Sequence, residues 1–272
     1  MDCDEHTLTD RQKREIEYHR IRAQQYNSLI DEPVSYDVLF SNRRRWWNAY
    51  WRMYDILLAQ QLKSKKCLIV GCGFGDDALR VAKLGGDVYA FDLSKESLEI
   101  ARQLAHREQL QLRLKELAAE RLAYSSNFFD VVIARDILHH TDIPVAMDEL
   151  CRVAKDGALV IINEIYSHSF THKVRYSNVV ESYLYPLMKE FVYRGAPYIT
   201  EDERKLNEVD IARIVNRLGH VDLTEYFDFI VNRILPGNIP LFNRIDRLLL
   251  LSLRPFASLL SGRILITGRM SK

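Results

Sequence analysis

Blocks of apolar and polar residues alternate along the middle of the chain and predict strands and helices in turn. Short apolar runs are typical of buried strands, whereas apolar residues at helical spacing indicate amphipathic helices. The strands are expected at 67–70, 88–91, 112–114, 131–134 and 158–163, and the helices at 76–84, 95–106 and 144–153. Because strands that alternate with helices form parallel sheets with right-handed crossovers, this order predicts an α/β fold with a doubly wound, mostly parallel sheet.

Helical periodicity also marks the residues before the first strand, which we expect to form an N-terminal helical cap over 1–62. Thr9 can cap a first helix, and Pro33 breaks the helical pattern. A second helix is expected from Ser41, with an aromatic and aliphatic stripe over 46–58 that packs on the sheet.

The pattern is less regular after the fifth strand. Residues 166–200 carry many tyrosines, phenylalanines and histidines, and we expect them to form a cover over the substrate. Residues 201–272 are expected to complete the core, beginning with a helix that is capped near Thr200 and ended by Gly219. The two remaining strands are expected at 222–231 and 263–268.

Between these last two strands, residues 235–262 carry apolar residues at helical spacing, with arginines such as Arg244 and Arg247 among them. This pattern suits a lid over a hydrophobic substrate or contact with an anionic membrane surface. The alternative is a helix that packs on its own domain or on a dimer partner. Pro255 interrupts the face and Asp246 lies within it, which favours packing over membrane contact.

A glycine-rich loop follows the first strand and predicts a ligand site. Gly71, Gly73 and Gly75 stand at alternating positions, where the backbone can turn tightly and a ligand can approach it closely. Asp92 ends the next strand, where an acidic residue can accept hydrogen bonds from the hydroxyls of a ribose. The sequence therefore predicts a site for a nucleoside.

Two carboxylates indicate what the nucleoside carries. A dinucleotide site needs a third glycine under the pyrophosphate, and this chain places Asp76 and Asp77 near the start of the helix instead. Acidic groups repel phosphate and suit a cation.

Four motifs together resemble those of the class I S-adenosylmethionine-dependent methyltransferases. They are Val70-Gly71-Cys72-Gly73-Phe74-Gly75, Phe91-Asp92, Phe128–Val132 and Ile137–His140. The resemblance covers about residues 60–165 and implies a Rossmann-like core, here 63–165, that binds S-adenosylmethionine as the methyl donor. Phe128–Asp130 are expected to pack and cap the fourth strand rather than to touch the ligand.

The resemblance also implies which residues hold the donor. The glycine loop would pass under the methionyl part, Asp92 would hold the ribose, and the segment around Ala119 and Glu120 would hold the adenine. Tyr26, at the end of the first helix, is expected to close over the donor. The residues implied in donor binding are Tyr26, Gly71, Cys72, Gly73, Gly75, Asp92, Leu93, Ala119, Glu120 and Arg135.

The chain departs from the family at two acidic positions. Ile69 stands where the family usually has an acid before the first glycine, and Ala118 replaces the first acid of the adenine segment. Another group would therefore have to meet the ammonium of the donor.

Two histidines and a glutamate are the candidate catalytic residues. His139 and His140 follow the fourth strand, and a histidine there could remove a proton from the acceptor because its pKa lies near neutral pH. We favour His140, and we expect Glu164, at the end of the fifth strand, to orient that histidine or to bind the acceptor. In the alternative interpretation the histidines are structural. No residues have a spacing that suits a metal site.

Composition narrows the choice of partners. The chain has 272 residues, is 47% hydrophobic and carries a formal net charge of only +1, which gives no general electrostatic case for binding nucleic acid. No apolar run approaches the length that spans a membrane. The chain has four cysteines, which are Cys3, Cys67, Cys72 and Cys151. They show no pairing motif, which favours a reducing cytoplasm.

These observations predict transfer of a methyl group from S-adenosylmethionine to a hydroxyl of a small molecule, such as a natural product or a hydrophobic metabolite. N-methylation is one alternative. Another, motivated by the missing acids, is a regulatory subunit that binds the nucleoside without turnover. A protein or RNA acceptor is disfavoured because the chain has no basic stripe and no RNA-binding module.

Overall fold

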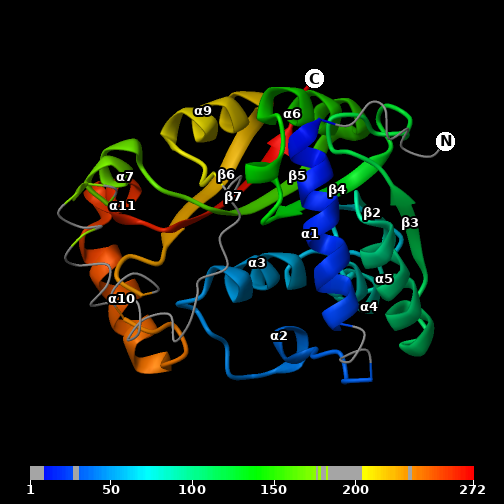
Figure 1. Cartoon of the computed structure of the whole chain (residues 1–272), viewed down its shortest axis with the longest axis horizontal. Coiled ribbons are helices and arrows are strands. Elements are labelled where there is room, and N and C mark those ends of the chain that lie inside the picture. Colours follow the sequence, from blue (N-terminus) through cyan, green and yellow to red (C-terminus); the bar gives the residue numbers. More distant parts are fainter. Residues whose placement is uncertain (1–8, 27–30, 176, 179–181, 183–203, 232–234) are drawn as a thin grey trace.

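A seven-stranded sheet forms the centre of the protein in the computed structural model, which describes residues 9–26, 31–175, 177–178, 182, 204–231 and 235–272 (Figure 1). The strand order is β3-β2-β1-β4-β5-β7-β6. The strands are β1 (Lys66–Val70), β2 (Asp87–Asp92), β3 (Leu112–Glu116), β4 (Phe129–Arg135), β5 (Ala154–Ile165), β6 (Leu218–Phe227) and β7 (Arg263–Met270). The first five pair in parallel, and β7 runs antiparallel to β5 and β6, which confirms the mostly parallel α/β fold.

Helices cover both faces of this sheet, as expected for a doubly wound fold. They are α1 (Asp10–Tyr26), α2 (Asp37–Phe40), α3 (Ala49–Leu58), α4 (Asp76–Lys83), α5 (Lys95–Arg107), α6 (Ile143–Val153), α7 (Ser169–Arg175), α9 (Glu208–Arg217), α10 (Pro240–Ser252) and α11 (Ala257–Leu260). Short 3-10 turns span Leu138–His140 and Arg254–Phe256.

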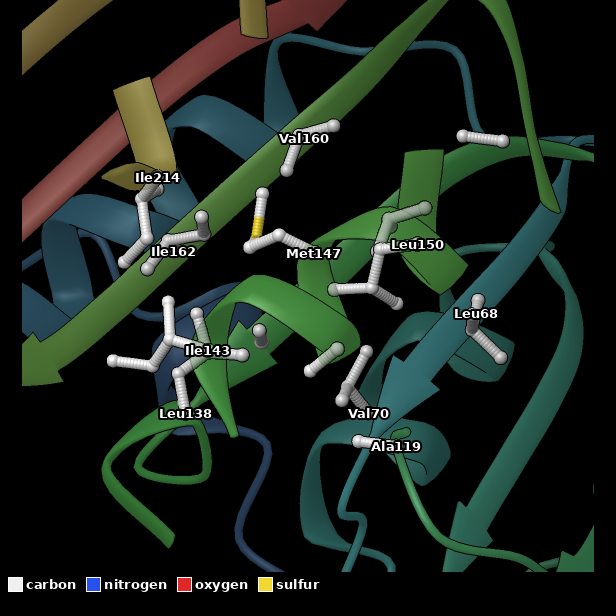
Figure 2. Packing of buried hydrophobic residues seen from close by; sticks show 14 of the residues in the cluster. Leu68, Val70, Ala119, Leu138, Ile143, Met147, Leu150, Val160, Ile162 and Ile214 are labelled. Carbon is white, nitrogen blue, oxygen red and sulfur yellow. The ribbon is translucent and has the colours of Figure 1, made fainter. Parts of the chain in front are cut away.

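The core has one layer of side chains on each face of the sheet. Figure 2 shows the first layer, in which Met147 and Leu150 of α6 and Ile214 of α9 pack against Val160 and Ile162 of β5. On the opposite face, residues of α3 and α4 pack against alternate residues of the same strands. Burial on both faces explains why these strands are continuous apolar runs without alternation.

The second predicted helix begins later than the sequence indicated. Ser41 lies just after α2, where the backbone becomes extended, so the prediction of a helix from Ser41 is wrong. The longer helix α3 begins at Ala49, because the side chain of Asn48 accepts a hydrogen bond from the backbone N–H of Trp51. The predicted apolar stripe over 46–58 is therefore only partly buried. Tyr54 of α3 is buried, whereas Trp46 precedes the helix and is 42% exposed.

The helix expected from Thr200 to Gly219 is shorter. It begins at Glu208, where Asn207 and Asp210 form a capping box, and it ends at Arg217. Gly219 lies within β6, so its prediction as a helix C-cap is wrong. Of the predicted substrate cover, residues 166–200, the described part includes α7, and residues 183–200 lie outside the described residues.

The last two strands form an antiparallel hairpin, and 228–262 connect them at one end. Phe227 of β6 pairs with Arg263 of β7, and Arg263 also pairs with Ile165, the last residue of β5. The segment that holds α10 and α11 therefore leaves the sheet at the same edge as the carboxyl end of β5.

Candidate functional site

A cavity of about 410 Å³ lies at the carboxyl ends of β1, β2, β4 and β5, which is where ligands bind in open α/β sheets. Most of the predicted site residues line it. Those that line it are Gly71, Cys72, Gly73, Asp92, Leu93, Ala119, Glu120, Arg135, His139 and His140. Gly75 instead faces α5, where an added Cβ would lie 2.8 Å from the Cβ of Ala101.

The glycine loop is shaped by backbone angles that side chains disfavour. Gly71 and Gly73 have φ of +59° and +50°. An added Cβ at Gly71 would lie 2.4 Å from a side-chain carbon of Ile137, whereas one at Gly73 would meet nothing within 4 Å. Gly73 thus leaves space at the cavity wall that a donor molecule can approach closely.

Asp92 is held in place by the loop it faces. Its Oδ2 accepts a hydrogen bond from the backbone N–H of Gly73 at 2.8 Å, and its Oδ1 accepts one from Ser94 at 2.9 Å. Each carboxylate oxygen has a second lone pair, so both retain capacity to accept a ribose hydroxyl. Asp92 is only 8% exposed, which keeps these acceptors out of competition with bulk water.

A chain of charges borders the opposite part of the cavity. Nε of Arg135 donates to Asp77 at 2.6 Å, and its NH1 nitrogen donates to Asp136 at 3.0 Å. Burial lowers the pKa of Arg135, but the two carboxylates outweigh this effect and raise it overall, so Arg135 is a permanent cation. Asp77 also accepts from the hydroxyl of Tyr54 at 2.6 Å. Of the two carboxylates that the sequence predicted to suit a cation, Asp77 therefore binds groups of the protein, whereas Asp76 lines the cavity.

Glu164 is fully buried and binds both His139 and the loop that carries it. Its Oε1 accepts hydrogen bonds from the backbone N–H groups of Ile137 and Leu138, each at 2.8 Å. Its Oε2 lies 2.7 Å from Nδ1 of His139. The ring of His140 packs against that of His139, with ring centroids 4.0 Å apart.

Helix α1 passes in front of the strand ends and closes one side of the cavity (Figure 1). The guanidinium of Arg11 donates to the carbonyl oxygen of His139, and Gln12 donates to Glu120 at 3.3 Å. Glu120 also accepts a hydrogen bond from the backbone N–H of Asp142 at 2.9 Å. Glu120 therefore links α1 to the segment before α6 at the edge of the cavity. The side chain of Tyr26 lies outside the described residues.

Sequence reasoning missed three residues of the lining that come from distant parts of the chain. Gln12 and Arg22 come from α1, and Arg263 begins β7. Arg263 also pairs with Asp136 at 2.8 Å. None belongs to a recognised motif, and only their place on a charged helix face and at a strand end could have indicated them.

The described residues contain no group of three or more His, Cys, Asp or Glu side chains that could hold a metal ion. Among the same residues, no helix has the length and apolar character needed to cross a membrane.

A family model described as a methyltransferase domain matches residues 68–162. An O-methyltransferase of ubiquinone biosynthesis from Paraburkholderia phymatum is 30% identical over 172 residues, covering 58% of this chain and 69% of that protein. The corresponding enzyme of Methylococcus capsulatus is 30% identical over 138 residues. That match spans 46% of this chain. It also spans 58% of the relative's length, which is less than two thirds.

Solved structures share the fold. Magnesium protoporphyrin IX methyltransferase from Synechocystis, with S-adenosylhomocysteine bound, aligns with a TM-score of 0.57 and 15% identity over 96% of this chain and 100% of that one. The [4+2]-cyclase SpnF aligns with a TM-score of 0.54 and 17% identity over 81% of this chain and 80% of that one.

The doubly wound sheet, its glycine loop and the acidic end of β2 define a nucleoside-binding α/β protein. The chain belongs to the class I S-adenosylmethionine-dependent methyltransferases. Its methyl donor is S-adenosylmethionine.

Proposed function

We propose that the protein methylates a hydroxyl group of a small molecule, with His139 as the general base. The observation that carries this proposal is the buried hydrogen bond between Glu164 and Nδ1 of His139 at the edge of the cavity. The names of the relatives, which are O-methyltransferases at 30% identity, support a hydroxyl acceptor. A relative from Cupriavidus metallidurans that is 25% identical is named as a C-methyltransferase.

Glu164 sets the tautomer of His139. A carboxylate only accepts hydrogen bonds, so Nδ1 of neutral His139 must carry the proton, and Nε2 is left with a lone pair. Nε2 can then take the proton of the acceptor hydroxyl as the oxygen attacks. Bound S-adenosylmethionine supplies the electrophilic methyl group, and its sulfur keeps the electrons of the broken bond. The hydrogen bond to Glu164 belongs to His139, so His139 replaces His140 as our proposed base.

Variants of the two histidines separate these roles. We expect His139→Ala to lower turnover on a hydroxyl acceptor roughly a hundredfold or more, as loss of a general base does, with donor affinity unchanged. The matched His140→Ala variant should lose much less. Turnover is measured with labelled donor and separate pools of phenols, aliphatic alcohols and amines, and donor affinity by calorimetry.

Three results would contradict this proposal. Labelling confined to the amine pool would indicate N-methylation, and donor binding without labelling of any pool would indicate a regulatory subunit. A loss of turnover in His140→Ala, with His139→Ala active and folded, would return the role of base to His140.

We further propose that Asp136 replaces the acid that is missing at Ile69 and meets the ammonium of the donor. Asp136 lines the cavity next to the glycine loop, and Arg135 and Arg263 hold its carboxylate in place. These cations outweigh the effect of burial and lower the pKa of Asp136, so it is ionised at neutral pH. The permanent charge of Arg135 could meet the donor's carboxylate in the same way.

We expect Asp136→Asn to weaken binding of S-adenosylmethionine roughly tenfold, because a neutral amide loses the charge-assisted contact with the ammonium. Calorimetry with methylthioadenosine, which lacks the amino-acid part, provides the control and should show unchanged affinity. Equal losses for both ligands would mean that Asp136 shapes the loop rather than binding the ammonium.

A further inference from the structure

Helix α10 and the turn after it expose apolar side chains and bury charged ones. Of the fifteen large apolar residues that are exposed in the described part of the chain, eight lie within 239–256. They are Ile239, Leu241, Ile245, Leu248, Leu249, Leu251, Leu253 and Phe256. Leu241 and Leu248 are 60% and 55% exposed, although a leucine normally packs inside a soluble protein.

The buried side of α10 is polar and fixes the orientation of the helix. Asp246 is 3% exposed and accepts hydrogen bonds from the backbone N–H groups of three consecutive residues, 229–231. Arg247 donates to the carboxylate of Glu225 at 2.8 Å and to the carbonyl oxygen of Tyr226. These contacts hold the leucines outward. They also remove one of the two objections that the sequence raised against membrane contact, because Asp246 faces the protein.

A second exposed segment lies beside α10. The guanidinium of Arg244 stacks over the ring of Trp47 at 4.5 Å, which joins α10 to 40–47. Phe40 and Trp46 in this segment are 63% and 42% exposed. On the other side, α11 contacts both α10 and α7, and Figure 1 shows these three helices together at one end of the protein.

Within the two segments that expose these apolar residues, the exposed charges have one sign. Within 235–262 the only acidic residue is Asp246, which is buried, whereas Arg244 and Arg254 are exposed. All charged residues of 40–47 are arginines, and Arg43 and Arg45 are exposed. Exposed leucines and tryptophans bordered by cations are typical of surfaces that bind anionic lipid headgroups.

We propose that this surface, made of 40–47 and 239–256, binds the face of an anionic lipid bilayer. The leucines would enter the boundary between headgroups and acyl chains, and the arginines would contact the headgroups. A second copy of the chain fits less well, because a two-fold interface would place this cationic patch against itself. Residues 239–256 belong to the connection that leaves the sheet at the carboxyl ends of β5 and β6, and the cavity lies at the same end of the strands. Binding through this surface would therefore bring the cavity close to acceptors dissolved in the bilayer.

Sedimentation of the full chain with vesicles tests this proposal without donor or acceptor, and therefore independently of the proposed reaction. We expect binding to vesicles of phosphatidylcholine mixed with phosphatidylglycerol, weaker binding to phosphatidylcholine alone, and release as salt screens the charges. The double variant Leu241→Ser with Leu248→Ser should reduce partitioning roughly tenfold or more. Arg43→Glu with Arg254→Glu should abolish the preference for anionic vesicles.

Val145→Ser with Val209→Ser is the matched control, because these residues are 44% and 52% exposed on α6 and α9, away from the proposed surface. It should bind vesicles as the wild type does. Wild-type protein that stays in the supernatant at low salt would overturn the proposal. Binding that is equal on neutral and anionic vesicles would also overturn it, as would a dimer that the leucine variant dissociates while vesicles bind nothing.

Discussion

Replacement of Asp92 by alanine is expected to weaken binding of S-adenosylmethionine roughly a hundredfold or more. Hydrogen bonds to a charged group each contribute about 1.5–3 kcal/mol, and the variant loses both ribose contacts that we assign to Asp92. It also releases the N–H of Gly73, which loosens the loop under the donor. Calorimetry with the donor and with its demethylated product measures the effect.

Ser94→Ala separates loss of the ribose contact from local destabilisation. Ser94 caps α5 by accepting a hydrogen bond from Ser97 at 3.1 Å, so its loss costs about 1 kcal/mol of stability. Donor affinity should stay near the wild-type value in this variant. Unchanged donor affinity in Asp92→Ala would remove the ribose assignment.

The second large effect is expected for Glu164→Gln, which should lower turnover roughly a hundredfold or more. The amide oxygen can still accept from Ile137 and Leu138, so the loop keeps its shape. The amide nitrogen must donate to Nδ1 of His139, which forces the proton onto Nε2 and removes the base. Donor affinity should be unchanged.

Glu149→Gln provides a control of the same chemistry away from the site, because Glu149 also accepts from a backbone N–H, that of Leu122 at 2.7 Å. It should leave turnover unchanged. Wild-type rates in Glu164→Gln would show that Glu164 only supports the loop and that His139 is not oriented by it.

The donor half of the fold could be predicted from the sequence because its signals are local. Apolar runs mark β1, β2, β4 and β5, and glycines and Asp92 stand at the ends of β1 and β2. The position of the donor site at the carboxyl ends of the strands therefore follows from the order of the strands alone. The predicted boundaries of helices were wrong where contacts made elsewhere in the fold determine them. The start of α3 depends on the cap by Asn48, and the end of α9 depends on the pairing of Leu218 and His220 with β7, which places Gly219 at a bulge between them.

The site was less predictable where it depends on contacts between distant residues. Neighbouring histidines look equivalent in the sequence, and only the position of Glu164 on the adjacent strand distinguishes His139. Asp77 resembled a ligand for a cation until Arg135, more than fifty residues later in the chain, proved to neutralise it. The direction of Asp246 likewise depends on backbone groups at 229–231.

The two long segments after β5 and between β6 and β7 leave the sheet at a single edge, whereas the donor loops come from the preceding, continuous part of the chain. Lengthening a loop costs little free energy, because closure entropy grows only slowly with length. We therefore expect that changes in the length or sequence of these two segments disturb the glycine loop and Asp92 little, so that the two parts of the chain can vary independently in sequence.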